Sequence, residues 1–130
     1  MALPTPSPID PAAQLWLALT TEASDALAEA LARRLLTDGL VACVSLQPLR
    51  SLYVWQGRLD QAQEVQLLLK TDGVRLADLE AAVHRLHSYE TPEWIAWPAS
   101  GSVGYSSWLR GVLDRGGTAG LSADVVPPAP

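Results

Sequence analysis

Apolar residues recur along the chain in two spacings, one typical of strands and one typical of helices. The run Leu15–Leu19 is apolar at every position, which predicts a strand buried on both faces. Leu27, Leu31 and Leu35 then recur every four residues, which predicts a helix with one apolar face. Gly39 predicts the end of this helix, because glycine readily adopts the left-handed conformation of a C-terminal cap.

The middle of the chain is predicted to form a pair of strands. Residues 40–46 and 51–55 are predicted strand segments, and Pro48 between them predicts a bend or a bulge. Residues 56–57 and the polar residues after them predict a hairpin connection. Apolar and polar side chains alternate along residues 64–71, which predicts the returning strand.

A second helix and a last strand complete the pattern. Apolar residues at steps of three and four predict a helix over residues 76–86, followed by a strand at 94–97 and a short helix at 105–113. The order β-α-β-β-α-β is an α+β, ferredoxin-like split βαβ arrangement, with helices on one face of an antiparallel sheet. The other face would be open, and its Trp and Leu side chains predict self-association.

Composition and charge restrict the class of protein. The chain has 130 residues, 48% of them hydrophobic and 18% charged, as expected for one globular domain. Its net charge of −5 argues against a nucleic-acid partner, since phosphate binding needs clustered Lys and Arg. No apolar run approaches the roughly 20 residues that span a bilayer, so no membrane association is expected. A single cysteine and the lack of a signal-peptide pattern predict a cytoplasmic protein.

Proline and glycine concentrate at both ends of the chain. We expect a Pro-rich tail at residues 1–13 and a Gly/Pro-rich tail at 114–130, because this composition disfavours regular structure. One domain is predicted between them, at residues 14–113.

Five short segments stand out in order between residues 15 and 113. They are LVACV at 40–44, SLYVWQG at 51–57, Glu64 with LLLKT at 67–71, HSYETPE at 87–93, and Tyr105 with Trp108-Leu109. Together they resemble the CutA family of divalent-cation tolerance proteins. The chain departs from the family pattern at Ser88, where proline is usual, and the loss of that ring predicts a looser loop.

The resemblance implies a PII-like homotrimer of ferredoxin-like subunits that binds copper or other divalent metals and contributes to the response to metal ions. No enzymatic activity is expected, because the chain shows neither a Gly-rich phosphate loop nor a nucleophile elbow. The alternative is a PII-like regulatory or interaction scaffold, which binds a small ligand or a protein partner in clefts between subunits.

Three residues are candidate metal ligands: Cys43, His87 and Glu90. A thiolate suits Cu(I), a neutral imidazole is a common ligand, and a carboxylate suits hard divalent ions. The alternatives are a small buried strand residue for Cys43, a loop-capping hydrogen bond for His87, and a salt bridge between subunits for Glu90.

Seven further residues are expected at intersubunit clefts or interfaces, where aromatic anchors are enriched. Lys70 is the only lysine, and it is a candidate for binding an anion or merely a solvated strand end. The full set is Trp55, Glu64, Lys70, Tyr89, Glu93, Tyr105 and Trp108.

Overall fold

The computed structural model describes residues 14–117. The element bounds are β1 Leu15–Glu22, α1 Asp25–Thr37, β2 Cys43–Trp55, β3 Arg58–Asp72, α2 Leu76–Leu86, β4 Ile95–Ala99 and α3 Val103–Asp114. The tail predicted at 1–13 lies outside the described residues, as does the tail predicted at 114–130 from residue 118 onward.

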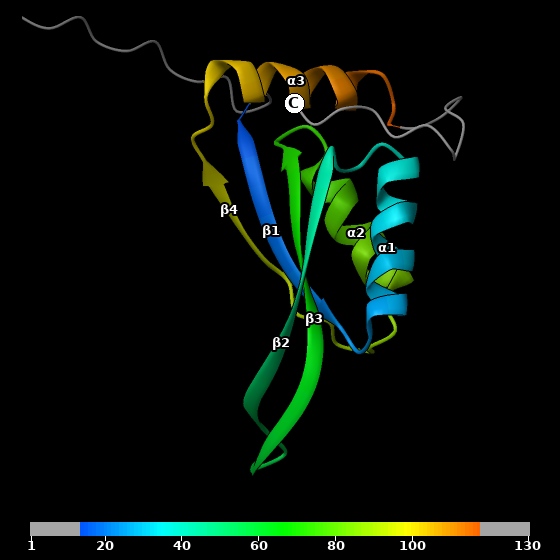
Figure 1. Ribbon diagram of the computed structural model, residues 1–130, viewed down its shortest axis with the longest axis vertical. Coiled ribbons are helices and arrows are strands. Elements are labelled where there is room, and N and C mark those ends of the chain that lie inside the picture. The colour runs from blue at the N-terminus through cyan, green and yellow to red at the C-terminus, as the bar shows by residue number, and fades with distance from the viewer. Residues whose placement is uncertain (1–13, 118–130) are drawn as a thin grey trace, which may run out of the picture.

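The strands form one antiparallel sheet in the order β2-β3-β1-β4. Figure 1 shows α1 and α2 along one face of this sheet and α3 across one of its ends. The predicted ferredoxin-like α+β arrangement with a short C-terminal helix is confirmed. The face away from α1 and α2 is called the open face here; it carries Cys43, Lys70, Leu17 and Trp97, which lie opposite one another on neighbouring strands.

The core lies between the sheet and the first two helices. Ala18, Leu67 and Leu69 face the helices and are fully buried, as the alternation along β1 and β3 requires. On α1 the buried face carries Leu35 and smaller neighbours, whereas Leu27 is 41% exposed, so its predicted place on the apolar face is wrong. The buried face is formed by Ala28, Leu31, Ala32 and Leu35, at helical spacing, and Leu27 lies outside it.

The hairpin of β2 and β3 is longer than the alternation of side chains predicts. β2 passes through Pro48 without a bulge, with Pro48 opposite Val65, because β2 is an edge strand where a missing N–H is tolerated. β3 begins at Arg58, so residues 58–63 are strand and not connection. The two strands join through a two-residue turn with Gln56 at φ 51° and Gly57 at φ 74°.

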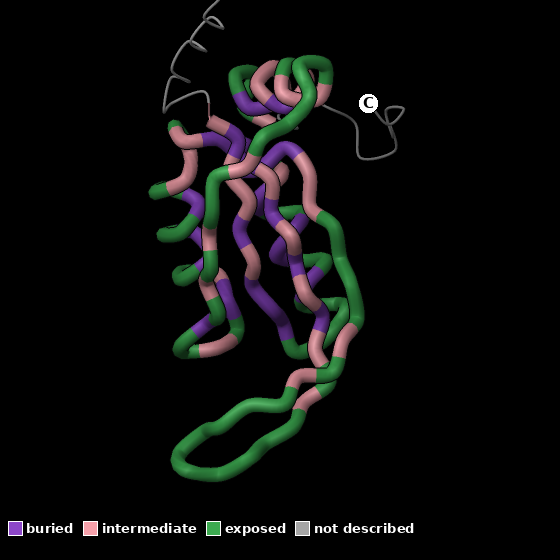
Figure 2. The backbone as a smooth tube through the Cα atoms, turned by 90° about the vertical axis from the view of Figure 1, so that its left-hand side faces the viewer, coloured by how far each residue is buried: buried purple, intermediate pink, exposed green. Residues whose placement is uncertain are grey.

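Residues 50–63 form a projection that is called the arm here. Figure 2 shows it extending beyond the body of the subunit, and its backbone is almost entirely coloured as exposed. The arm is held by strand pairing from Arg50 opposite Gln63 to Trp55 opposite Arg58. No helix covers it in the described chain, and its apolar side chains face solvent.

α3 is attached to the end of the sheet by packing and by charge. Leu109 and Leu113 are buried against Leu15 and Ala42. The carboxylate of Asp72, fully buried at the end of β3, binds Arg75 at 2.7 Å and Arg110 of α3 at 3.3 Å; Arg75 in turn binds Asp114 at 2.9 Å. Within residues 14–117 no helix is long and apolar enough to cross a membrane.

Candidate functional site

A cavity of about 780 Å³ lies where the base of the arm meets the loop between α2 and β4. The arm contributes aromatic and acidic side chains, and the loop contributes Tyr89 and the acidic residues that follow it. The lining residues are Thr21, Ser51, Leu52, Tyr53, Trp55, Asp60, Glu64, Tyr89, Glu90, Thr91 and Glu93.

His87 anchors this loop to the end of β1. α2 ends at Leu86 and His87 takes an extended conformation, which turns its side chain inward until it is fully buried. Its Nε2 lies 2.6 Å from the carbonyl oxygen of Thr21, and its Nδ1 lies 2.9 Å from the backbone nitrogen of Tyr89. A carbonyl only accepts and an amide only donates, so the partners assign the proton to Nε2 and the lone pair to Nδ1.

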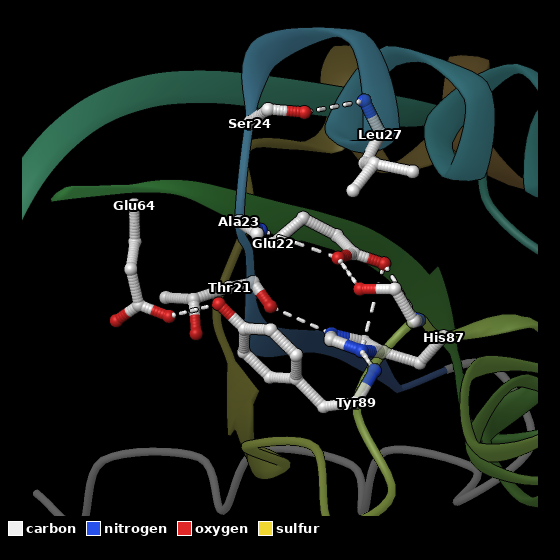
Figure 3. Close-up of polar contacts among 9 residues, drawn as sticks. Thr21, Glu22, Ala23, Ser24, Leu27, Glu64, His87 and Tyr89 are labelled. Carbon is white, nitrogen blue, oxygen red and sulfur yellow. Dashed lines mark hydrogen bonds and ion pairs between the residues drawn. The ribbon is translucent and has the colours of Figure 1, made fainter. Parts of the chain in front are cut away.

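Glu22 is a second buried group beside His87, as Figure 3 shows. Its side chain is 2% exposed, and its Oε2 lies 3.5 Å from Nδ1 of His87. Ser88 donates to Glu22 twice, from its backbone nitrogen at 3.1 Å and from its hydroxyl. A proline at position 88 makes neither bond. The loop that was predicted to loosen is therefore attached to β1 by contacts that the usual residue cannot form.

Tyr89 links the same loop to the base of the arm. Its hydroxyl donates to Oε2 of Glu64 at 2.8 Å (Figure 3). Burial, reinforced by the hydrogen bond to Glu64, raises the pKa of the Tyr89 phenol well above its ordinary value. Tyr89 therefore stays protonated at neutral pH and donates to one oxygen of Glu64, while the second carboxylate oxygen has no hydrogen bond among the described residues.

The cavity has a strongly acidic lining. Asp60, Glu64, Glu90 and Glu93 line it without any Lys, Arg or His. Within residues 14–117 none of the four carboxylates forms an ion pair. Unpaired carboxylates around a hollow produce a negative potential that attracts cations.

The structure brings together one part of the predicted site and separates the rest. Trp55, Glu64, Tyr89, Glu90 and Glu93 all line the cavity. Four other candidates lie at the α3 end of the sheet, namely Cys43, Lys70, Tyr105 and Trp108. His87 lies beside the cavity, but its side chain is turned inward and buried.

Cys43 and His87 do not share a site within the subunit. Cys43 lies opposite Lys70, which lies opposite Leu17, whereas His87 binds Thr21. Four residues of strand separate those two positions of β1 by about 13 Å. Both nitrogens of His87 are already hydrogen-bonded, and the described chain contains no group of three His, Cys, Asp or Glu side chains placed to hold a metal ion. Ligation by Cys43, His87 and Glu90 stays a prediction, without a common centre.

Sequence reasoning missed two acidic residues. Glu22 is the only charged residue of β1, and this position at the end of a largely apolar strand is the signal from which its burial could have been suspected. Asp60 was placed in a connection because most of residues 58–63 are polar. Nothing in the spacing reveals that Asp60 lies in a strand opposite Tyr53.

The comparison with protein families decides the identity. Residues 16–112 match the family model described as CutA1 divalent ion tolerance protein. The chain belongs to the CutA1 family. This confirms the resemblance found in the five sequence segments.

Curated and solved CutA proteins agree with this assignment. A divalent-cation tolerance protein CutA of Pectobacterium atrosepticum is 43% identical over 97 residues, covering 73% of this chain and 88% of that protein. The structure of CutA from Synechococcus elongatus has a TM-score of 0.75 at 37% identity, covering 78% of this chain and 91% of that one. A protein of Archaeoglobus fulgidus named periplasmic divalent cation tolerance protein CutA has a TM-score of 0.74 at 31% identity, with 76% and 98% covered. These names do not favour the scaffold alternative.

Proposed function

We propose that this CutA-family chain binds divalent cations in the acidic cavity at the base of the arm. The observation that carries the proposal is the set of four unpaired carboxylates, Asp60, Glu64, Glu90 and Glu93, around one hollow. Carboxylate oxygens are the donors that hard divalent cations prefer. The names of the relatives, divalent-cation tolerance proteins, support the same class of ligand.

The cavity of one subunit does not close around an ion. No three His, Cys, Asp or Glu side chains among the described residues are placed to hold one ion, although the carboxylates line the same cavity. We therefore infer that water or a neighbouring subunit completes the coordination.

A homotrimer is the assembly that we propose for this purpose. The arm exposes Leu52 at 59%, Val54 at 74% and Leu59 at 76%. Apolar surface of this extent on a soluble chain is typical of an interface. The arm also forms part of the cavity wall, so burial of the arm by a second copy would place groups of that copy beside the carboxylates.

Isothermal titration with Mn²⁺ and Cu²⁺ tests the cation site. The variant Glu90→Gln/Glu93→Gln should weaken binding by about tenfold or more, or about 1.4 kcal/mol. Glu29→Gln is the control, because Glu29 is an exposed carboxylate of α1 paired with Arg33, far from the cavity lining. Equal affinities for wild type and the double variant would contradict the proposal.

Copper is the finer part of the proposal. Cys43 is the only thiol, but the ammonium of Lys70 lies 3.5 Å from its sulfur and disfavours a second cation there. We therefore propose that copper binds as Cu²⁺ at the carboxylates. An anaerobic Cu(I) titration in which tight binding disappears in Cys43→Ser would place copper at the thiol instead.

Location and catalysis are further parts of the proposal. We propose a cytoplasmic protein, supported by a single unpaired cysteine, which is typical of reducing compartments. Cell fractionation tests this, since one relative is named periplasmic. We also propose a binding protein without catalytic activity, supported by relatives whose names state tolerance and no reaction.

A further inference from the structure

The only lysine of the chain, Lys70, is a half-buried cation without a carboxylate partner in the part of the chain that the structure describes. Lys70 lies on the open face at the α3 end of β3, and its ammonium donates to Ser45 Oγ at 3.2 Å and to Cys43 Sγ at 3.5 Å. No ion pair joins Lys70 to a carboxylate among residues 14–117. A partly buried charge that lacks a counter-charge is costly, which makes the position favourable for an anion.

Three protic groups from different elements surround this ammonium. Cys43 lies directly opposite Lys70 on β2, and Ser45 follows two residues later on the same face. The Tyr105 phenol of α3 lies near both groups, because Cys43 and Lys70 each influence its pKa. Tyr105 is held in place because its backbone nitrogen donates to the capping Ser102 and its ring packs on Trp108 at 5.5 Å.

These neighbours are able to donate hydrogen bonds to a bound group. The Ser45 hydroxyl accepts from Lys70, so its own proton is free to point elsewhere. Burial, with Cys43 as the next cause, raises the pKa of the Tyr105 phenol, and Lys70 opposes this shift. The phenol is therefore a neutral donor at physiological pH.

The carboxylates near this end of β3 are paired with arginines. Asp72 is two residues from Lys70 on the same strand, but its carboxylate already binds Arg75 and Arg110. Asp114 binds Arg75. The carboxylate of Asp72 is therefore engaged by two guanidinium groups, and it forms no ion pair with Lys70.

We propose that Lys70, Ser45 and Tyr105 form a binding site for a small oxyanion such as phosphate. The ammonium supplies the charge, and the two hydroxyls supply neutral hydrogen bonds to the remaining oxygens. The site lies at the α3 end of the open face, whereas the acidic cavity lies at the base of the arm, so neither proposal depends on the other. The competing explanation is that the Cys43 thiolate itself is the counter-ion of Lys70.

Equilibrium dialysis with radiolabelled inorganic phosphate tests the site. Lys70→Met should weaken phosphate binding by at least about tenfold, because a charge-assisted hydrogen bond is lost. Arg58→Met is the matched control, since it removes one positive charge at the exposed tip of the arm and should leave binding unchanged. Ser45→Ala and Tyr105→Phe should each weaken phosphate binding several-fold. These two variants replace Lys70→Met as the test if that variant does not fold.

Several results would overturn the proposal. Wild type that retains no phosphate above the solvent level has no such site. Equal retention by wild type and Lys70→Met, or an equal loss in Lys70→Met and Arg58→Met, would mean that general charge and not this cluster binds the anion. Acetate in place of phosphate distinguishes a carboxylate ligand from a phosphate ligand at the same residues.

Cys43 provides an internal reporter of occupancy. Its sulfur lies 3.5 Å from Lys70 Nζ, so a bound anion should slow its alkylation by neutral iodoacetamide. Phosphate should protect Cys43 in the wild type and should not do so in Ser45→Ala/Tyr105→Phe. Phosphate binding that disappears in Cys43→Ser but survives in Ser45→Ala/Tyr105→Phe would assign the site to the sulfur and contradict the proposed hydroxyl donors.

Discussion

The two halves of the β2–β3 hairpin have the same pairing and opposite surroundings. In the body, Val65, Leu67 and Leu69 of β3 are at most 6% exposed beneath α1 and α2. In the arm, Val54 and Leu59 lie opposite each other on the same two strands and are 74% and 76% exposed. Backbone hydrogen bonds continue through both halves, whereas side-chain burial ends where the helices end.

The difference shows that pairing and burial stabilise different parts of one hairpin. Strand pairing satisfies the backbone of the arm, but an isolated two-stranded hairpin is only marginally stable in water. The body half gains its stability from the apolar area that the helices remove from water. We infer that the arm gains comparable burial only from another copy of the chain.

The largest expected effect comes from a core leucine. Leu67→Ala should lower the free energy of unfolding by about 3–4 kcal/mol at any protein concentration, because Leu67 is fully buried. Leu59→Ala should cost less than about 0.5 kcal/mol when the protein is dilute and dissociated, and more as the concentration rises. Urea unfolding over a range of concentrations measures both. A concentration-independent cost for Leu59→Ala would contradict burial of the arm by assembly.

The next effect concerns the charges that attach α3 to the body. Asp72→Asn should destabilise the fold by about 3 kcal/mol, because two guanidinium groups would lose a fully buried counter-charge. Thermal unfolding monitored by Trp fluorescence measures the loss. Asp60→Asn is the matched control in the arm, where the carboxylate is exposed and forms no ion pair within residues 14–117, and its unfolding temperature should match the wild type within about 1 °C.

Substitution of two glycines with similar φ angles distinguishes the steric cost of an added Cβ from the cost of the left-handed conformation. Gly39 has φ 71°, and an added Cβ would lie 2.7 Å from the Gly116 carbonyl carbon; Gly57 has φ 74° and nothing within 4 Å. Gly57→Ala should cost only the left-handed conformation, about 1 kcal/mol. Gly39→Ala should cost more, because the C-terminal turn must also move. Equal losses in the free energy of unfolding, measured with urea, would show that this turn moves at no cost.

The smallest effect is a pH dependence at the junction of body and arm. The folded state raises the pKa of Tyr89, so its contribution to stability is complete below about pH 10, the unfolded value, and is lost as pH rises further. The stability difference between wild type and Tyr89→Phe should therefore shrink between pH 9 and pH 11. Glu64→Gln should reduce this pH dependence, because it removes the charged acceptor of the phenol. A difference that does not change with pH would contradict the role of the hydrogen bond.

Local patterns in the sequence predicted most of the fold. The alternation in β3 and the helical spacing over Leu76–Leu86 specify periods of two and 3.6 residues, which survive in any environment. Gly57 specified the hairpin turn because few other residues adopt its φ. The same interpretation failed at residues 58–63, where mostly polar residues form a strand that pairs with β2.

The candidate site was predicted in part, through the segment that contains Tyr89, Glu90 and Glu93. That segment lines the cavity, but its partner Asp60 lies on the arm and was not recognised. Cys43 and His87 were grouped by their chemistry alone. The structure places them about 13 Å apart along the sheet, because strand register and the entry of the loop are decided by packing.

The sequence by itself determined the element order, the CutA membership and the acidic, lysine-poor composition. Each of these depends on which residues are adjacent in the chain. Only the tertiary structure decided that Ser88 binds buried Glu22, that His87 is turned inward, and that Lys70 meets Tyr105 of α3. Such contacts join residues far apart in the chain, and they form only when the helices close on the sheet and set which face each side chain occupies.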